Sequence, residues 1–373
     1  MKIRVVFVTD VMQDVRMVEG FAGIFDLTVL APRYLEERFI TWPTNKPFER
    51  VFLPVGRARF VFQAAKWLRR NRGRFKVIIA QDNLTGALAS NIGGRLTRTP
   101  VILRMGRTTE EYYRSKRHAG LKGLRYWIGL ITVKALVGFN ERAAASVGAT
   151  SLYIADDCRK RARDVHVIPA YGVDLELFSA KVSRAEARTI LDLPLDVSLI
   201  IWRSRLAPEK DPETYFRALA LLGERGYQVN GLYVGAEYLE ILRIAQPFGI
   251  TMIARDAVHP KDLAHFYRAA DVAVQTSRVE GFGLSPLEAL ACETPVVASR
   301  IGGLVETIID GKTGITVAPN DPEATADAIA WMLDHPDDAA ALARNGRQLI
   351  AERYTDEVAF GGWLALAQRL AAR

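Results

Sequence analysis

Residues 271–299 constrain the fold of this chain more than any other stretch. They begin with an apolar run at 272–274 that predicts a short buried strand, and a loop with two glycines follows at 276–284. Ser285 and Pro286 then predict a helix start, with serine as the N-cap and proline as the first helical residue. Because unpaired backbone N–H groups and the positive end of the helix dipole converge there, the segment predicts an anion site.

Two acidic residues, Glu280 and Glu288, lie eight positions apart in this segment. One interpretation is structural, because Glu288 completes a capping box with Ser285 and Glu280 is a solvated loop acid. The other interpretation places both carboxylates at the anion site, where they bind a ligand. The two residues alone leave both interpretations open.

The sequence pattern of residues 271–299 as a whole resembles the donor-site motif of retaining glycosyltransferase family 4 (glycosyl transferases group 1), which has the GT-B fold. In that family the first glutamate contacts the donor sugar, the second holds the ribose hydroxyls, and amides of the glycine loop meet the diphosphate. The resemblance therefore implies donor binding by Gly283, Leu284, Ser285 and Glu288, with Glu280 beside the sugar. Glu293 stands where the family usually has glycine. The matching residues are Glu280, Gly281, Phe282, Gly283, Glu288 and Pro295.

Residues 203–210 add two cations to this expectation. Arg205 and Lys210, five positions apart, match the arginine and lysine that ion-pair with the donor diphosphate in the family. A departing nucleoside diphosphate gains negative charge, and two preorganised cations stabilise that charge without a metal. The resemblance thus implies Arg205, Lys210 and Glu280 as catalytic residues. Without it, the segment reads as a charged loop between a strand and a helix.

No metal and no cofactor are expected besides a nucleotide-diphosphate sugar, UDP- or GDP-linked, as donor substrate. The five histidines are scattered, and no Asp-x-Asp segment is placed like a metal site. The resemblance implies front-face displacement, in which the leaving phosphate takes the acceptor proton and no enzyme nucleophile is required. A nicotinamide dehydrogenase is excluded, since no Gly-x-Gly-x-x-Gly follows the first strand.

The length and the alternation of strands and helices predict two domains. A chain of 373 residues, 49% hydrophobic, is long for one core. Strand and helix patterns alternate in both halves, so the fold class is α/β. Together with the resemblance, this predicts GT-B: two Rossmann-like, doubly wound parallel-sheet domains facing a cleft.

The domain boundary is expected near residues 169–178, which resemble the family's interdomain segment. Residues 151–154 and 165–168 are interpreted as the last strands before it. The expected domains are an acceptor-binding domain at 1–170, a donor-binding domain at 171–355, and a C-terminal helix at 356–373 that crosses back to the N-terminal domain.

Charge is distributed unevenly between the two halves. Residues 1–170 hold 30 Lys and Arg against 14 Asp and Glu, a net charge of +16, and residues 171–373 hold 20 against 28, a net charge of −8. The basic half is expected to face an anionic partner, although arginines that merely solubilise the surface are an alternative. With the resemblance, this predicts a glycan, glycolipid or other anionic or lipid-linked acceptor of cell-envelope or polysaccharide biosynthesis.

Residues 110–140 interleave aromatic and basic side chains. This pattern suits a helix at the surface of an anionic membrane, and the alternative is a domain helix whose apolar face packs into the core. Nucleic acid is not an expected partner, because the donor motif points elsewhere. The residues concerned are Tyr112, Tyr113, Tyr126 and Trp127, with Arg114, Lys116, Arg117, Lys122, Arg125 and Lys134.

A cytoplasmic location is expected, with a peripheral position at the inner face of the membrane as its extension. Two cysteines give no disulfide framework, and the sequence shows neither a signal peptide nor a bilayer-spanning run.

The first half departs from the family in two places. Residues 12–14 contain no glycine pair after the first strand, and Gly106 or Arg107 stands where many members have histidine or aspartate. Alternative functions therefore stay open. One is a GT-B relative with epimerase or phosphorylase chemistry, and the other is a membrane- or polyanion-binding protein with a degenerate site.

Overall fold

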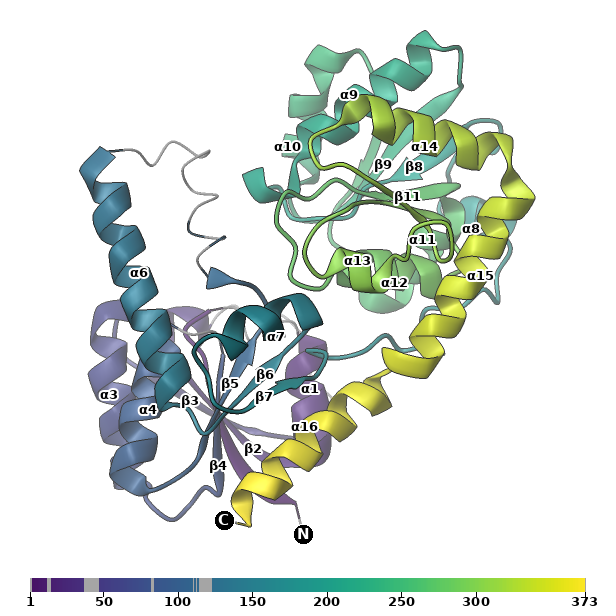
Figure 1. Ribbon diagram of the computed structural model, residues 1–373. Coiled ribbons are helices and arrows are strands. Elements are labelled where there is room, and N and C mark those ends of the chain that lie inside the picture. Colours follow the sequence, from purple (N-terminus) through teal and green to yellow (C-terminus); the bar gives the residue numbers. More distant parts are fainter. Residues whose placement is uncertain are drawn as a thin grey trace. The chain divides into compact units, whose positions relative to one another are not determined.

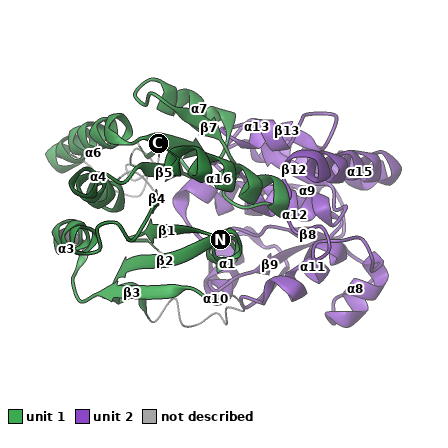
Figure 2. Cartoon of the chain, turned by 90° about the horizontal axis from the view of Figure 1, so that it is seen from below, with its two compact units in different colours: residues 1–172, 356–373 green, residues 173–355 purple. Residues whose placement is uncertain are grey.

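The chain forms two compact units, each built around its own parallel sheet. Unit 1 comprises residues 1–172 and 356–373, and unit 2 comprises residues 173–355 (Figure 2). The computed structural model describes residues 2–11, 15–36, 47–81, 84–109, 111, 113 and 123–372.

Unit 1 contains a seven-stranded sheet in its described residues, in the order β3-β2-β1-β4-β5-β6-β7, with all neighbouring strands parallel. The central strands are continuous apolar runs because helices cover both faces of the sheet. The strands are β1 (Ile3–Val8), β2 (Phe25–Pro32), β3 (Glu49–Leu53), β4 (Val77–Gln81), β5 (Val101–Met105), β6 (Ser146–Ala149) and β7 (Val165–Val167).

Helices of unit 1 lie on both faces of this sheet, and α3, α4 and α6 run side by side along one of them (Figures 1 and 2). Helices α1 and α16 cover the other face, where the ring of Phe21 contacts the rings of Phe7 and Trp363. The helices are α1 (Val15–Ile24), η1 (Arg33–Leu35), α3 (Arg57–Arg70), α4 (Thr85–Thr97), α6 (Gly123–Ala143), α7 (Leu152–Arg159) and α16 (Asp356–Ala371).

The last helix of the chain belongs to unit 1. Trp363 of α16 is fully buried, and its indole N–H donates to the carbonyl of Pro169 over 2.8 Å. Gly148 of β6 makes room for this ring, since a Cβ atom there would lie 2.4 Å from it. The prediction that the C-terminal helix returns to the N-terminal domain is therefore confirmed.

Unit 2 contains a six-stranded parallel sheet in the order β10-β9-β8-β11-β12-β13. Its strands are β8 (Ser198–Ile201), β9 (Val229–Val234), β10 (Met252–Arg255), β11 (Val272–Gln275), β12 (Val296–Ser299) and β13 (Ile315–Val317). Its helices are α8 (Arg184–Ile190), η2 (Pro208–Lys210), α9 (Pro212–Glu224), α10 (Tyr238–Ala245), η3 (Gln246–Phe248), α11 (Pro260–Ala269), α12 (Leu284–Ala291), α13 (Leu304–Thr307), α14 (Pro322–Asp334) and α15 (Pro336–Arg353).

Both sheets reverse their strand order once, between β1 and β4 in unit 1 and between β8 and β11 in unit 2. This is the doubly wound arrangement, in which ligands bind outside the carboxyl ends of the strands at the reversal. The predicted pair of Rossmann-like sheets is confirmed.

Two local predictions are wrong. Helix α12 begins at Leu284 after an N-cap at Gly283, and Ser285 lies inside its first turn without capping it. Gly283 adopts the left-handed conformation (φ 87°), which ends the loop two residues earlier than the serine pattern indicates. Residues 151–154 are not a strand, because the Ser151 hydroxyl accepts from the amide of Ile154 and caps α7.

Candidate active site

The predicted site residues of unit 2 gather at the reversal point of its sheet. The loop after β8 carries Arg205 and Lys210, and the loop after β11 carries Glu280 and leads into α12. Because β8 and β11 are parallel neighbours, both loops leave the same edge of the sheet. Residues far apart in the sequence thus meet where a doubly wound sheet binds its ligand.

Lys210 and Glu280 form an ion pair across the two loops. Nζ of Lys210 lies 2.5 Å from Oε2 of Glu280, and each side chain is 15% exposed. The Ser277 hydroxyl also donates to this carboxylate, over 3.3 Å. The structure therefore brings a catalytic candidate from each loop into direct contact.

A set of hydrogen bonds fixes the backbone beside Lys210. The Thr276 hydroxyl accepts from the indole N–H of Trp202 and donates to the carbonyl of Asp211, over 3.1 and 2.8 Å. Asp211 is buried in the left-handed conformation, and its carboxylate accepts from Arg278 Nη2 over 2.8 Å. These contacts set the direction in which Lys210 leaves its loop.

Arg205 does not contact Lys210 in the structure. Its side chain is 68% exposed, and Nη2 lies 3.4 Å from Oε1 of Glu209 within the same loop. An exposed pair of this kind contributes little stability. The guanidinium is consequently able to leave Glu209 for a phosphate at small cost.

The glycine loop is held close to the loop that follows β12. The amide of Gly303 donates to the carbonyl of Glu280 over 3.1 Å. A Cβ atom at Gly303 would lie only 2.1 Å from the carbonyl oxygen of Gly281, so no larger residue fits without movement. Leu284 and Ser285 then form the first turn of α12, where N–H groups lack intrahelical acceptors and attract anions.

Glu288 is fully buried one turn into α12. The Tyr267 hydroxyl donates to its carboxylate over 2.9 Å, and Nη1 of Arg203 lies 3.7 Å from the same oxygen. Burial and the nearby Glu288 raise the pKa of Tyr267 well above its ordinary value, so the phenol stays a donor. Glu288 is therefore an oriented acceptor and not a capping residue.

Arg203 was not among the predicted site residues. Besides its approach to Glu288, its Nη1 donates to the Ser285 hydroxyl over 3.4 Å. It also lines a pocket of about 10 Å³ together with Tyr267, Gln275 and Ser285. The sequence signal was present, because Arg203 alternates with Arg205 directly after β8.

Ser277 and Arg278 were also missed, although both precede Glu280 in the same loop. Ser277 bonds to the Glu280 carboxylate, and Arg278 reaches Asp211 and the side-chain carbonyl of Asn320, over 2.8 Å each. The family pattern of this loop includes only its glutamate and the three residues after it. The signal that could have identified Ser277 and Arg278 is that both are polar and lie just before Glu280.

In unit 1, Gly106 and Arg107 directly follow β5 at the carboxyl edge of the sheet. Beside them, Arg104 is buried, and its Nη1 donates to Oε1 of Gln81 over 2.6 Å. Residues 12–14 lie outside the described part of the chain. The role of Gly106 or Arg107 stays a prediction.

The aromatic and basic residues of region 110–140 fall partly inside and partly outside the described residues. Tyr126 is buried in α6 and Trp127 is exposed, with Arg125 and Lys134 also at the surface. Tyr113 stacks on Tyr126, with ring centroids 5.9 Å apart. Tyr112, Arg114, Lys116, Arg117 and Lys122 lie outside the described residues.

The described residues contain neither a metal-binding cluster nor a membrane-spanning helix. Across the described ranges, no group of three or more histidine, cysteine, aspartate or glutamate side chains is arranged to hold a metal ion. In the part of the chain that the structure describes, no helix has the length and apolar character needed to cross a bilayer.

Comparisons with known proteins agree with this geometry. Residues 183–349 match the family model of glycosyl transferases group 1. The sequence is 39% identical over 210 residues to D-inositol 3-phosphate glycosyltransferase 2 of Catenulispora acidiphila, which covers 52% of this chain and 47% of that protein. The match thus spans about half the length of such relatives.

Solved structures resemble the whole chain. Sucrose-phosphate synthase from Thermosynechococcus elongatus superposes with a TM-score of 0.81 at 23% identity, covering 100% of both chains. Anabaena HepE, solved with UDP-glucose, superposes with a TM-score of 0.76 at 18% identity, covering 99% of this chain and 100% of its own. At these identities the likeness establishes the GT-B fold. Residues 183–349, which lie within unit 2, therefore form a glycosyl transferases group 1 domain.

Proposed function

We propose that the protein is a retaining glycosyltransferase that moves a sugar from a nucleotide-diphosphate sugar to an acceptor hydroxyl. The observation that carries the proposal is the contact of Lys210 with Glu280, a residue of the loop that leads into the first turn of α12. A cation, a carboxylate and free helix amides together suit a ligand with both a diphosphate and a sugar.

In the proposed reaction, Lys210 and Arg205 bind the diphosphate, with the amides of Leu284 and Ser285 completing its site. Glu280 accepts from sugar hydroxyls and Glu288 from the ribose. The bond from the anomeric carbon to the phosphate oxygen breaks, and that oxygen's new charge is stabilised by the cations. The acceptor hydroxyl attacks from the same face and gives its proton to the leaving phosphate. The products are the glycosylated acceptor and a nucleoside diphosphate.

The proposed donor is a UDP- or GDP-sugar. HepE, which shares the fold, was crystallised with UDP-glucose. Residues 171–355 would form the donor-binding domain, since Arg203, Lys210, Glu280 and Glu288 all lie in unit 2.

The proposed acceptor is anionic and is a glycan, a glycolipid or another lipid-linked molecule of envelope or polysaccharide biosynthesis. Its binding is assigned to residues 1–170, where the net charge is +16. Support comes from the relatives named for D-inositol 3-phosphate, an anionic compound. Both cysteines are free and buried, which suits a reducing compartment, so a cytoplasmic location is part of the proposal. A lipid-linked acceptor would place the protein at the inner face of the membrane.

The test is thermal stabilisation by UDP, GDP, ADP and their sugar derivatives in the presence of EDTA. Ligand that binds the folded state raises the melting temperature by mass action. We expect one base to give a selective rise that is much smaller in Glu288→Gln at the same ligand concentration. Release of the matching nucleoside diphosphate, with a product whose anomeric configuration equals that of the donor, completes the test. No rise with any nucleotide would refute the proposed site.

A further inference from the structure

Helix α6 of unit 1 has two apolar faces, and only one of them is packed. The packed face includes Tyr126, Leu130 and Val137, all buried against the unit. On the opposite face lies a row of large exposed apolar side chains, which we call the outer stripe. Its members are Leu124 (74% exposed), Trp127 (54%), Ile128 (55%), Ile131 (66%) and Phe139 (49%).

The outer stripe follows helical periodicity and so forms one continuous surface. Leu124, Trp127, Ile128 and Ile131 stand at positions i, i+3, i+4 and i+7, which share a helix face. With Phe139 included, the stripe runs for about 22 Å at 1.5 Å per residue. A contiguous apolar surface of this kind marks an interaction site more often than scattered exposed residues do.

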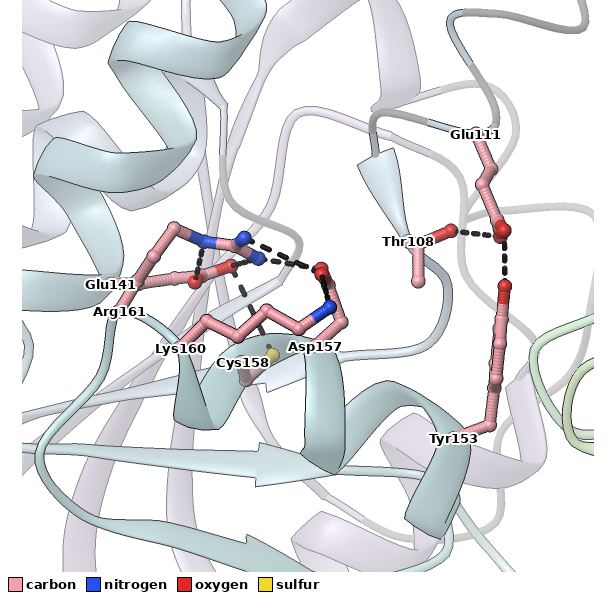
Figure 3. A network of polar contacts seen from close by, with 8 residues as sticks. All are labelled: Thr108, Glu111, Glu141, Tyr153, Asp157, Cys158, Lys160 and Arg161. Atoms are coloured by element: carbon pink, nitrogen blue, oxygen red, sulfur yellow. Dashed lines mark hydrogen bonds and ion pairs between the residues drawn. The ribbon is translucent and has the colours of Figure 1, made fainter.

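The far end of α6 is fixed firmly to unit 1. Arg161 bridges the buried carboxylate of Glu141 and that of Asp157, with Nε of Arg161 2.6 Å from Glu141 (Figure 3). The Asn140 side chain donates to the carbonyl of Leu84 over 3.1 Å. The start of α6, in contrast, projects beyond α3 and α4 (Figure 1). The helix therefore presents its outer stripe on a rigid support.

The charge around the stripe identifies its partner. Helices α3, α4 and α6 together contain nine Lys and Arg residues and one acidic residue, Glu141, which is buried against Arg161. A second copy of the chain would bring the same positive charge to the contact, which opposes self-association through this face. An anionic bilayer instead accepts both the cations, at its head groups, and the apolar side chains.

We propose that the outer stripe of α6 docks on the surface of an anionic lipid bilayer, with Trp127 and Ile131 inserted at the boundary between head groups and acyl chains. Arg125 and Lys134 flank the stripe at exposed positions, where they meet lipid phosphates. The helix lies on the membrane and does not cross it. This surface contains none of the donor-site residues, so it goes beyond the proposed reaction and stands independently of it.

The experiment is flotation of the full chain with vesicles of phosphatidylcholine containing about a third phosphatidylglycerol, against vesicles of phosphatidylcholine alone. We expect binding to the anionic vesicles at low salt, about tenfold weaker binding to the neutral ones, and weakening as salt rises. The double variant Trp127→Glu, Ile131→Glu should lose at least about tenfold in affinity. A matched control is Leu239→Glu in α10 of unit 2, equally exposed at 66%, which should float like the wild type.

Three outcomes would overturn the proposal: a wild type that stays unbound, a double variant that floats as well as the wild type, or a wild-type dimer that the double variant splits. Nucleotide-induced stabilisation, measured on the same samples, should be equal in the wild type and the double variant. Loss of vesicle binding with nucleotide binding intact thus separates the membrane surface from the donor site.

Discussion

Nζ of Lys210 lies 2.5 Å from Oε2 of Glu280, and these two largely buried groups join the two loops at the reversal point of the unit 2 sheet. The pair is electrically neutral, so a donor diphosphate needs further cations. Arg205 at the surface and Arg203 beside Glu288 are further cations of the loop that carries Lys210. The ion pair orders Lys210 in advance, which lowers the cost of stabilising charge later.

Lys210→Ala should lower kcat by about 100-fold or more while changing donor affinity much less, because the charge that Lys210 stabilises develops mainly in the transition state. Steady-state kinetics and calorimetric titration with the nucleotide donor separate the two effects. Lys312→Ala, at an exposed turn of the same unit, is the control and should leave both values unchanged. Wild-type turnover in Lys210→Ala would contradict the assignment.

The contact between Lys210 and Glu280 should also be visible without any donor. Lys210→Met and Glu280→Gln should each reduce the free energy of unfolding, and the double variant should cost less than their sum by about 1–3 kcal/mol. Urea denaturation of the four proteins gives this coupling. Strict additivity would mean that the two side chains do not interact in solution.

The sequence pattern predicts the sheets of this protein better than its loops. Apolar runs such as 3–8 predict buried parallel strands, because helices cover both faces of such a sheet and polar side chains would be buried on either face. The donor motif named both Lys210 and Glu280, and their contact with each other is a finding of the structure, while their roles stay a prediction. Arg203 and Arg205 both follow β8, and the sequence does not distinguish which of them lies near Glu288, because that contact depends on how α12 packs beside the loop.

The start of α12 shows why local signals failed. Serine followed by proline and glutamate is a strong capping pattern, but Gly283 ends the loop first, and Glu288 is drawn into the interior by Tyr267 and Arg203. Tertiary contacts with residues more than 20 positions away overrode the local preference. The same limit applies to α6, whose packed and exposed faces are equally apolar in sequence.

Glu288→Gln should raise the dissociation constant for the nucleoside diphosphate by about tenfold or more, because a neutral amide accepts ribose hydroxyls less strongly than a carboxylate. Arg203→Ala should cause a similar loss by removing the cation beside Glu288, and Arg203→Lys should recover part of it. Calorimetric titration measures all three. If Arg203→Ala bound nucleotide like the wild type, the pair would be structural only.

Arg278→Ala should destabilise unit 2 by about 2 kcal/mol, because Asp211 is buried and would keep only the Thr214 hydroxyl, 2.7 Å away, as a side-chain partner. The loss is below that of a fully buried pair, since the Arg278 side chain is 35% exposed. Arg217→Ala, which breaks an exposed pair with Glu213, should change stability by no more than about 0.5 kcal/mol. Urea denaturation compares them, and equal effects would contradict the prediction.

Gly303→Ala tests whether the glycine loop must lie against its neighbour. The added Cβ would lie 2.1 Å from the carbonyl oxygen of Gly281, so the backbone at Gly303 and the backbone at Gly281 would have to move apart. We expect a loss of about 1–3 kcal/mol in unfolding free energy, together with weaker nucleotide binding, because Glu280 and the start of α12 move with Gly281.

The matched control for that variant is Gly223→Ala in α9 of the same unit, where nothing lies within 4 Å of the added carbon. Alanine is the better helix former, so this change should leave stability unchanged or raise it by up to about 1 kcal/mol, and nucleotide binding should not change. Circular dichroism melts and nucleotide titration distinguish the two variants. If Gly303→Ala behaved like Gly223→Ala, the loop after β12 would be free to move away, and its close packing would not be what shapes the phosphate site.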